Sequence, residues 1–177
     1  MKKFAGRIKG MVIIMKVLIV SDTHGREKYL LDTIQRVSPI DMLIHLGDFE
    51  GGEESIRSMA GCSVEFVSGN NDFFTSIPKE KIIKVGNYSI MLTHGHRYSV
   101  THSLNLLWEE AKRNYVDVVM YGHTHVPYIE KYNGIWFVNP GSISLPRQDG
   151  RPTFIIMDID SKGGIHFTLN HIKRKVF

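Results

Sequence analysis

The chain has 177 residues and a mass of 20.2 kDa, with 42% hydrophobic and 23% charged residues. This length supports one buried core, so we expect a single domain. The longest apolar run, 11–20, contains Lys16 and is shorter than the about 20 residues of a membrane span, so no membrane association is expected. An aromatic content of 10% and frequent aliphatic residues exclude a disordered chain.

The net charge of +4 comes from the two ends of the chain. Residues 1–16 carry five Lys or Arg and no acid, and residues 171–177 carry three and no acid. The remaining segment, 17–170, holds 14 basic and 18 acidic residues, a net charge of −4. We therefore expect solvated basic tails and no groove that binds nucleic acid. Nucleic acid is not an expected partner, except in the form of a nucleotide substrate.

The chain ends and the cysteine content predict a reducing location. Cys62 is the single cysteine and cannot form an internal disulfide. The basic start leads into a strand without a small-residue cleavage site, so we expect a cytoplasmic protein. The first strand is expected to begin at Lys16, which makes residues 1–14 a candidate N-terminal extension and 15–177 the single domain.

Short β-branched runs alternate with segments of helical spacing in the first part of the chain. Each run ends in small and polar residues, as strands do when they enter a loop. The expected strands are 16–20, 42–46, 64–67, 89–92 and 118–121. The expected helices are 27–37, about 53–59 and about 102–114. The alternation favours parallel βαβ units.

Three hairpins are expected in the second part. The pairs 81–85/87–92 and 128–132/135–138 flank Gly86-Asn87 and Asn133-Gly134, residues that tolerate positive φ. The third pair is 153–159/165–171. The sequence therefore predicts a parallel first half and an antiparallel second half, packed as two sheets with helices outside.

Polar side chains gather where the five expected strands end, and ligands bind at such ends in open α/β sheets. Five of the nine histidines lie there. The candidate metal ligands are Asp22, His24, Asp48, Asn70, His94, His123 and His125. Oxygen and imidazole ligands without thiolate suit Mn, Fe or Zn better than Ca. Seven ligands exceed the need of one tetrahedral ion and favour two ions that share a carboxylate, an arrangement that hydrolyses phosphate esters.

Two expectations concern local geometry. The spacings Asp22-x-His24 and His123-x-His125 direct both side chains inward if the backbone there is extended. His45 lies inside an apolar run, so we expect a hydrogen-bonded core histidine and not a ligand.

The polar clusters also resemble, in order, the five motifs of the calcineurin-like metallophosphoesterases over about residues 16–125. The matching motifs are Asp22-x-His24, Gly47-Asp48, Gly69-Asn70-x-Asp72, His94-Gly95-His96 and Gly122-His123-x-His125. Asn139-Pro140-Gly141-Ser142 with Pro146-Arg147 resembles the small bacterial and archaeal phosphodiesterase branch. The resemblance implies an α/β fold, a four-layer αββα sandwich of two mixed β-sheets flanked by helices, with a dinuclear centre at its edge.

The resemblance also implies the ligand sets and the reaction. One ion would be held by Asp22, His24, Asp48 and His125, and the other by Asp48, Asn70, His94 and His123, with Asp48 bridging. The implied protein is a divalent-metal-dependent phosphodiesterase in which a hydroxide held between the ions attacks a small phosphodiester substrate. Manganese is the first choice of metal, with Fe, Ni and Zn as alternatives.

One position departs from the family pattern. Asn71 stands where many members have a histidine that contacts phosphate and helps to protonate the leaving group. An amide cannot deliver a proton, so diesters and activated esters should be favoured over alkyl monoesters. His96 is a candidate replacement donor, and Arg97 and Arg147 are candidate phosphate contacts. The expected catalytic residues are Asp48, Asn71 and His96, and the expected substrate contacts are Asn71, His96 and Arg97.

Two other functions remain open. A catalytically weak or inactive metal-binding scaffold is one, because the resemblance includes a retromer scaffold subunit of the same fold. The metal motifs of that subunit's family are eroded, whereas every expected ligand type is present here. A nucleic-acid-binding module would rest on the basic tails alone and would show steep salt dependence. A homodimer is also considered, because dimers are common among similar proteins.

Overall fold

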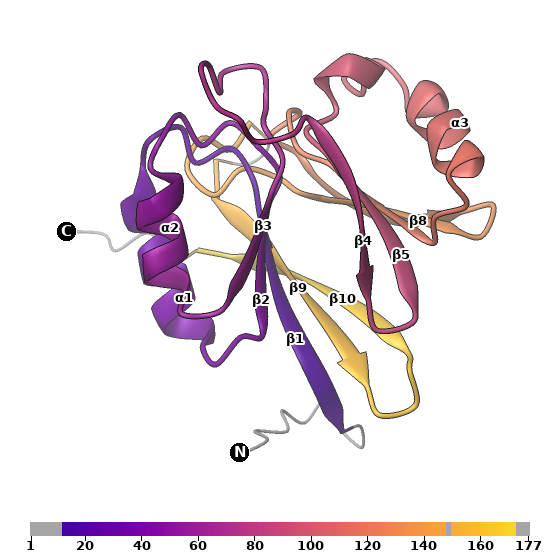
Figure 1. Ribbon diagram of the computed structural model, residues 1–177, viewed down its shortest axis with the longest axis horizontal. Coiled ribbons are helices and arrows are strands. Elements are labelled where there is room, and N and C mark those ends of the chain that lie inside the picture. Colours follow the sequence, from indigo (N-terminus) through magenta and orange to yellow (C-terminus); the bar gives the residue numbers. More distant parts are fainter. Residues whose placement is uncertain (1–11, 148–149, 173–177) are drawn as a thin grey trace.

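The computed structural model describes residues 12–147 and 150–172 and contains two five-stranded sheets (Figure 1). The first sheet has the order β10-β9-β1-β2-β3. Its strands are β1 (Ile13–Val20), β2 (Met42–His45), β3 (Ser63–Phe66), β9 (Thr153–Asp160) and β10 (Ile165–His171). β1, β2 and β3 are parallel, and β9 is antiparallel to both of its neighbours.

The second sheet has the order β4-β5-β6-β8-β7. Its strands are β4 (Glu80–Val85), β5 (Tyr88–Thr93), β6 (Val118–Met120), β7 (Pro127–Tyr132) and β8 (Ile135–Pro140). β5, β6 and β8 are parallel, whereas β4 and β7 pair antiparallel at the two edges. Both sheets are therefore mixed.

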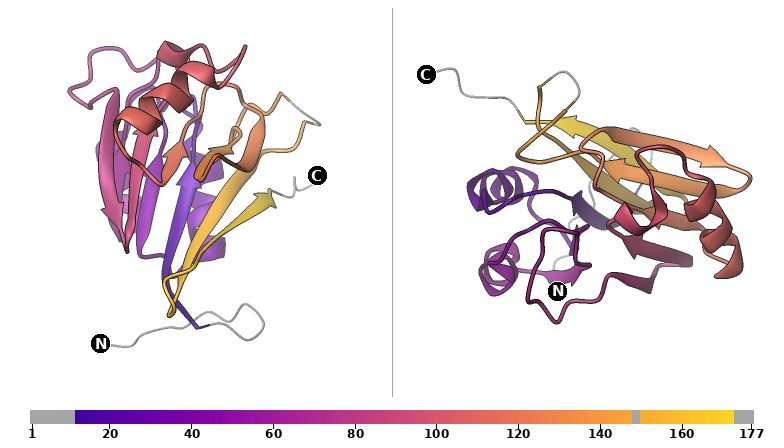
Figure 2. Two further views of the ribbon diagram at one scale, coloured as in Figure 1. Left: turned by 90° about the vertical axis from the view of Figure 1, so that its right-hand side faces the viewer. Right: turned by 90° about the horizontal axis from the view of Figure 1, so that it is seen from above.

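The helices lie on the outer faces of the two sheets, which gives the expected αββα order of layers (Figures 1 and 2). α1 (Glu27–Val37) and α2 (Glu53–Ala60) cover the first sheet, and α3 (Asn105–Arg113) covers the second. A short 3-10 turn, η1 (His96–Tyr98), follows β5. No helix within the described ranges has the length and apolar character needed to cross a membrane.

Alternation along the central strands explains how one strand serves two cores. Val17 and Ile19 of β1 point into the core between the sheets, whereas Leu18 and Val20 pack under α1 and α2. Successive side chains of a strand point to opposite faces, so a strand covered on both sides is apolar at every position. This rule explains the continuous apolar runs of the sequence.

Two elements begin three residues away from their predicted starts, whereas the other boundaries differ by at most two residues. β1 begins at Ile13, which pairs with Asp160 of β9, and not at Lys16. Residues 13 and 14 are thus part of the sheet, while the rest of the predicted extension, apart from residue 12, lies outside the described residues. α3 begins at Asn105 and not near His102, because Ser99 has a left-handed φ of 51° and the chain turns there before the helix begins.

The three expected hairpins form, but the topology of the second half differs from the antiparallel one that the sequence predicts. It is not wholly antiparallel, since β5, β6 and β8 run parallel, and the final hairpin joins the first sheet beside β1. All eight residues of β9 are buried, so this strand needs cover on both faces and a partner on both edges. The turn at Asn133 and Gly134 has the expected positive φ values, 47° and 87°.

Candidate metal centre

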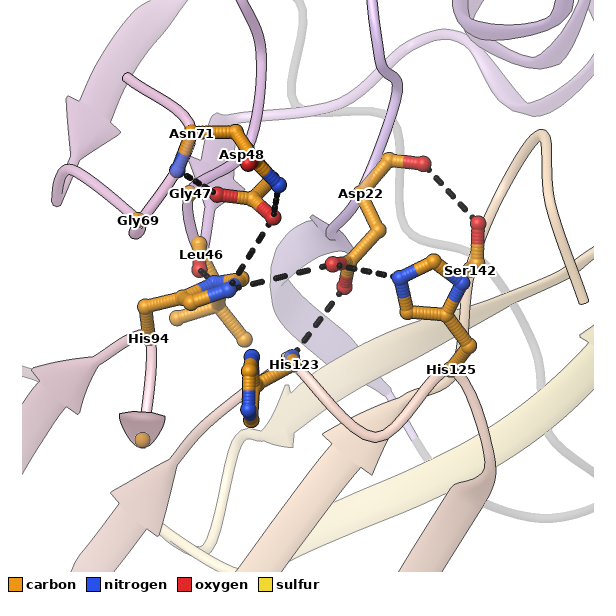
Figure 3. A network of polar contacts seen from close by, with 12 residues as sticks. Asp22, Leu46, Gly47, Asp48, Gly69, Asn71, His94, His123, His125 and Ser142 are labelled. Atoms are coloured by element: carbon orange, nitrogen blue, oxygen red, sulfur yellow. Dashed lines mark hydrogen bonds and ion pairs between the residues drawn. The ribbon is translucent and has the colours of Figure 1, made fainter. Parts of the chain in front are cut away.

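The loops that follow β1, β2, β5 and β6 meet at one end of the sandwich (Figure 3). Backbone hydrogen bonds fasten them to one another. The Asp22 N–H donates to the Gly47 carbonyl at 3.0 Å, and the Gly122 N–H donates to the His94 carbonyl at 3.1 Å. The carboxyl ends of strands from both sheets therefore deliver their polar residues to one place.

The Asp22 carboxylate lies at the centre of this group. Its side chain is fully buried, and its Oδ1 faces the rings of His94 and His125 (Figure 3) and also the ring of His24. The distances from Oδ1 to the Nε2 atoms are 3.1 Å for His125, 3.8 Å for His24 and 3.9 Å for His94. Its Oδ2 accepts a hydrogen bond of 3.3 Å from the backbone N–H of His123.

Backbone carbonyls set the tautomers of two of these histidines. Nδ1 of His94 lies 2.7 Å from the Leu46 carbonyl, and Nδ1 of His125 lies 2.6 Å from the Leu145 carbonyl. A carbonyl oxygen only accepts, so each Nδ1 carries the hydrogen, and in the neutral ring the lone pair is on Nε2. Both rings thus present a lone pair to the Asp22 carboxylate.

His24 is oriented in the same sense by a side chain. Its Nδ1 lies 2.6 Å from Oε1 of Glu50, so Nδ1–H donates to the carboxylate and Nε2 points inward. Nε2 of His24 lies 3.3 Å from Nε2 of His125. A third histidine therefore adds its lone pair to the same group.

Asp48 is the second carboxylate of the centre. Its Oδ2 lies 3.4 Å from Nε2 of His94 and 4.0 Å from Nε2 of His24. The Asn71 backbone N–H donates to Oδ1 at 2.9 Å and the Asn71 side chain donates to Oδ2 at 2.7 Å. Asp48 is thereby held facing the histidines.

Two overlapping triads have the spacing that a metal ion requires. Each triad offers ligand atoms within 4.8 Å of one another. They are Asp22, His24 and His125, and Asp22, Asp48 and His94. Asp22 belongs to both triads. The family resemblance implies that Asp48 bridges the two ions, and this role stays a prediction.

The donor set fits divalent cations. Three imidazole lone pairs and two carboxylates face one another, and Asp22 Oδ1 and His94 Nε2 are buried without a hydrogen-bond partner among the described residues. Acceptors that face acceptors in a buried site are unfavourable unless a proton or a cation lies between them. Mixed nitrogen and oxygen ligands suit a first-row divalent ion.

The pKa values of His94, His125 and Asp48 also indicate that positive charge is favoured at this site. Burial alone would lower the pKa of His94 and of His125, but the neighbouring carboxylates outweigh it and raise both values. Burial alone would raise the pKa of Asp48, but His94 and the hydrogen bonds from Asn71 hold it below its usual range. The site therefore favours bound protons on histidine wherever no other cation neutralises the carboxylates.

The backbone of these loops is not extended, although the prediction for Asp22-x-His24 and His123-x-His125 assumed extended backbone. Five candidate ligands have positive φ: Asp22 57°, His24 47°, Asp48 53°, His123 68° and His125 59°. Left-handed backbone is uncommon outside glycine and concentrates at functional sites, where the surrounding contacts hold it. Alternate left-handed residues, and not strand pleating, bring the paired side chains together.

The remaining candidate ligands are placed differently. The His123 ring lies 5.1 Å from the His94 ring, centroid to centroid. Burial and the charge of His94 lower the pKa of His123. Asn70 is exposed and makes no hydrogen bond within the described part of the chain, so its role as a ligand stays a prediction. The amide that contacts the centre is the next one, Asn71.

The expected substrate contacts lie around the rim. The His96 ring centroid is 5.5 Å from that of His94, and burial together with the charges of His94 and His123 lowers the pKa of His96 to about 4. Arg97 is 56% exposed and its Nη1 pairs with Oε1 of Glu80 at 2.7 Å. The structure thus brings His96 to the centre and directs Arg97 to β4. Contact of either residue with substrate stays a prediction.

His45 is the hydrogen-bonded core histidine that the sequence predicted. It is fully buried, its Nδ1 accepts from the Gly47 N–H at 3.3 Å, and its Nε2 lies 3.1 Å from Oγ1 of Thr23. Burial lowers the pKa of His45 to about 3, so the ring is neutral. Because Nδ1 accepts a hydrogen bond, Nε2 carries the hydrogen and donates it to Thr23. This bond connects the loop after β1 to the end of β2.

Residues of the segment after β8 support the Asp22 loop, a role that the sequence motif did not reveal. Ser142 Oγ donates to the Asp22 carbonyl at 2.8 Å, and Ser144 Oγ lies 2.9 Å from the carbonyls of Asp22 and Thr23. The Asn139 side chain donates to the Gly122 carbonyl at 2.8 Å. These buried bonds satisfy carbonyls that the left-handed turns leave without a strand partner.

Asp72 and Glu50 make further hydrogen bonds around the centre, and the sequence predicted a role for neither. The Asp72 carboxylate accepts hydrogen bonds of 2.7 Å from the backbone N–H groups of Asp48, Glu50 and Gly69. Asp72 was visible as the last residue of a motif, but Glu50 has no sequence signal, because its role depends on a loop conformation with φ of 57°.

The glycines of two motifs let the loops approach closely. A Cβ on Gly47 would lie 2.8 Å from Nδ1 of His94, and a Cβ on Gly69 would overlap Oδ1 of Asp48. Gly47 also has a φ of +95°, which disfavours other residues. The Gly-Asp and Gly-Asn pairs of the sequence are therefore required by packing around Asp48.

Comparisons with known proteins agree with this site. The calcineurin-like phosphoesterase superfamily domain model matches residues 15–162. The probable metallophosphoesterase YsnB of Bacillus subtilis is 33% identical over 148 residues, covering 83% of this chain and 86% of YsnB. The phosphodiesterase MJ0936 of Methanocaldococcus jannaschii is 29% identical over 166 residues, covering 84% of this chain and 95% of MJ0936.

A solved structure of a predicted phosphoesterase is also similar to this chain in its fold. A conserved uncharacterized protein from Streptococcus pneumoniae TIGR4, described as a predicted phosphoesterase, aligns with a TM-score of 0.74 at 25% identity. The alignment covers 89% of this chain and 98% of that chain. The fold, the ordered motifs and the converging ligands lead to one assignment: this chain belongs to the calcineurin-like phosphoesterase superfamily.

Proposed function

We propose that the protein is a divalent-metal-dependent phosphodiesterase that acts on small phosphodiesters. The observation that carries this proposal is the buried pair of acceptors, His94 Nε2 and Asp22 Oδ1, which lie 3.9 Å apart beside Asp48 and lack hydrogen-bond donors among the described residues. The name of the archaeal relative, phosphodiesterase MJ0936, supports the choice of reaction.

The chain offers enough ligands for two ions. Asp22, His24 and His125 would hold one ion, and Asp48, His94, His123 and Asn70 would hold the other. The two sets adjoin at their carboxylates, because Asp22 also belongs to the triad of Asp48 and His94, and Asp48 lies near His24 as well as His94. Two divalent ions supply Lewis acidity, which activates water and neutralises the charge of the phosphate in the transition state. Manganese is the first choice, and Fe, Ni and Zn are alternatives.

The fixed rings and carboxylates supply preorganisation. The Leu46 and Leu145 carbonyls hold His94 and His125 in single tautomers, and Asn71 holds Asp48 through two hydrogen bonds. Hydrogen bonds made to the metal-binding side chains orient these ligands and reduce the reorganisation that the reaction requires.

The preference for diesters rests on Asn71. Its amide donates to Asp48 at 2.7 Å and has no proton to transfer. An alkyl monoester has a poor leaving group and gains about 10²- to 10⁴-fold from general acid catalysis, so it is the substrate most affected by the absence of an acid at this position. Diesters with activated leaving groups need that proton least.

The experiment compares a chromogenic phosphodiester with its monoester. Metal-stripped protein is titrated with Mn²⁺, and hydrolysis of bis(p-nitrophenyl) phosphate and p-nitrophenyl phosphate is measured for the wild type, Asp48→Asn and Asp32→Asn. Asp32 is an exposed residue of α1 and controls for the change in charge. The proposal predicts Mn²⁺-dependent diester hydrolysis that Asp48→Asn abolishes and Asp32→Asn retains. Absence of turnover with Mn²⁺, and also with Fe²⁺, Ni²⁺ and Zn²⁺ in repeat titrations, would support the scaffold alternative.

A further inference from the structure

We propose that Glu50 is the positioning residue that sets the strength of the metal subsite formed by Asp22, His24 and His125. This inference rests on the proposed metal centre and concerns the half of it that contains His24. Oε1 of Glu50 lies 2.6 Å from Nδ1 of His24, and Nε2 of the same ring lies 3.8 Å from Oδ1 of Asp22.

The three fixed histidines differ in the group that accepts the Nδ1 hydrogen. His94 and His125 donate to backbone carbonyls, at 2.7 and 2.6 Å, whereas His24 donates to a carboxylate. A hydrogen bond to an ionised acceptor is about twice as strong as a neutral one, and a carboxylate partner raises the basicity of a metal-bound imidazole. His24 is therefore the ring whose electron donation depends on a side chain.

The backbone holds Glu50 in the position that this contact needs. The Glu50 N–H donates to Oδ1 of Asp72 at 2.7 Å, and Oδ2 of Asp72 accepts from the N–H groups of Asp48 and Gly69. Glu50 has a φ of 57°, a conformation that a glutamate adopts only when its surroundings hold it. The same loop thus places Asp48 on one side of the centre and Glu50 behind His24.

The contact between Glu50 and His24 lies at the surface and is not part of the hydrophobic core. The Glu50 side chain is 41% exposed and that of His24 is 13% exposed. Removal of the Glu50 carboxylate leaves no cavity in the core, so its effect should be confined to the His24 ring. Within the described residues, Glu50 makes no hydrogen bond or ion pair with the second triad of Asp22, Asp48 and His94.

The experiment measures Mn²⁺ binding by isothermal titration calorimetry, without substrate, in metal-stripped full-length protein. Glu50→Ala removes both the hydrogen bond and the charge. Glu50→Gln keeps an oxygen that can accept from Nδ1 and removes only the charge. Glu54→Gln, at an exposed position of α2, is the matched control. Thermal unfolding in EDTA establishes that each variant is folded.

We expect two binding steps in the wild type. Glu50→Ala should weaken one of them by about 10- to 100-fold and leave the other unchanged, because outer contacts of metal-bound histidines carry effects of that size. Glu50→Gln should weaken the same step to a smaller extent, and Glu54→Gln should leave both steps unchanged. A loss confined to one step is not produced by general destabilisation.

Two results would overturn the inference. One is a wild-type isotherm in Glu50→Ala, and the other is an equal weakening of both steps. If the wild type binds two ions and hydrolyses the diester while Glu50→Ala behaves as wild type, the role of Glu50 is wrong and the proposed function stands. If the wild type binds no Mn²⁺, the proposed function fails and this inference fails with it.

Discussion

Nε2 of His94 and Oδ1 of Asp22 lie 3.9 Å apart in the protein interior, and neither atom has a hydrogen-bond donor within the described residues. The Leu46 carbonyl fixes the hydrogen of His94 on the opposite ring nitrogen, so a lone pair faces a carboxylate. Burial of two acceptors against each other is costly without a cation.

Replacement of Asn71 by histidine should change the choice of substrate. Asn71→His introduces a group that can transfer a proton at the rim of the centre, so the ratio of monoester to diester kcat/KM should rise by about 10-fold or more. The ratio is measured with alkyl phosphate esters in saturating Mn²⁺. Asn71→Gln, which lengthens the amide without adding a titratable group, should not raise it. An unchanged ratio in Asn71→His would show that this position does not decide the preference.

Loss of the Ser144 hydroxyl should destabilise the Asp22 loop. Ser144→Ala removes the donor that lies 2.9 Å from the carbonyls of Asp22 and Thr23 in a buried position. The free energy of unfolding should fall by about 1–3 kcal/mol, the usual cost of a buried group left unsatisfied. Urea unfolding in EDTA measures the change. Ser76→Ala, at an exposed site, should stay within about 0.5 kcal/mol, and equal losses in both variants would argue against the role of Ser144.

The neutral state of His45 should appear in the pH dependence of stability. Its pKa is lowered from 6.5 to about 3 by burial, so between these values the unfolded chain binds more protons than the folded protein. Stability from this group is present at pH 7 and is lost as the pH falls below 6.5. Between pH 7 and pH 5 the wild type should lose about 2 kcal/mol more unfolding free energy than His45→Gln.

Urea unfolding in EDTA at the two pH values provides this comparison. The other histidines are common to both proteins, so their contributions cancel in the difference. Parallel losses in the wild type and His45→Gln would mean that His45 titrates near its ordinary pKa in the folded protein.

A methyl group at position 69 should displace Asp48. In Gly69→Ala the new Cβ would overlap Oδ1 of Asp48 and would lie 2.6 Å from its backbone nitrogen. A shift of about 1 Å in a catalytic group can cost about 100-fold in rate, so kcat/KM for the diester should fall by about that factor. Gly61→Ala is the control, because position 61 has a φ of +63° and open space around it. It should lower stability by about 1 kcal/mol and leave kcat/KM unchanged.

The elements and the location of the site could be predicted from the sequence for a physical reason. The buried strands are apolar on both faces, so runs such as 16–20 and 118–120 are distinct from their polar ends. The five polar ends identified the place where Asp22, Asp48 and His94 meet. The His45 environment was also predictable, because a lone histidine in an apolar run has to be satisfied by hydrogen bonds.

The details of the site could not be predicted because they depend on backbone torsions and long-range pairing. Residue spacing could not reveal the left-handed φ of His125, nor that Asn71 and not its exposed neighbour Asn70 would contact Asp48. Glu50 approaches His24 through a turn that no motif encodes. The partner of the final hairpin was missed because local alternation does not say which sheet a strand will join.

The most direct test of the two-metal centre is the anomalous difference map of crystals grown with Mn²⁺. We predict two peaks about 3.5–4 Å apart, the spacing of two-metal hydrolytic centres. One should be ligated by Asp22, His24 and His125, and the other by Asp48 and His94. A map with no peak at these residues, or with a single ion that leaves His94 without a metal, would contradict the two-metal centre on which the proposed phosphodiesterase activity depends.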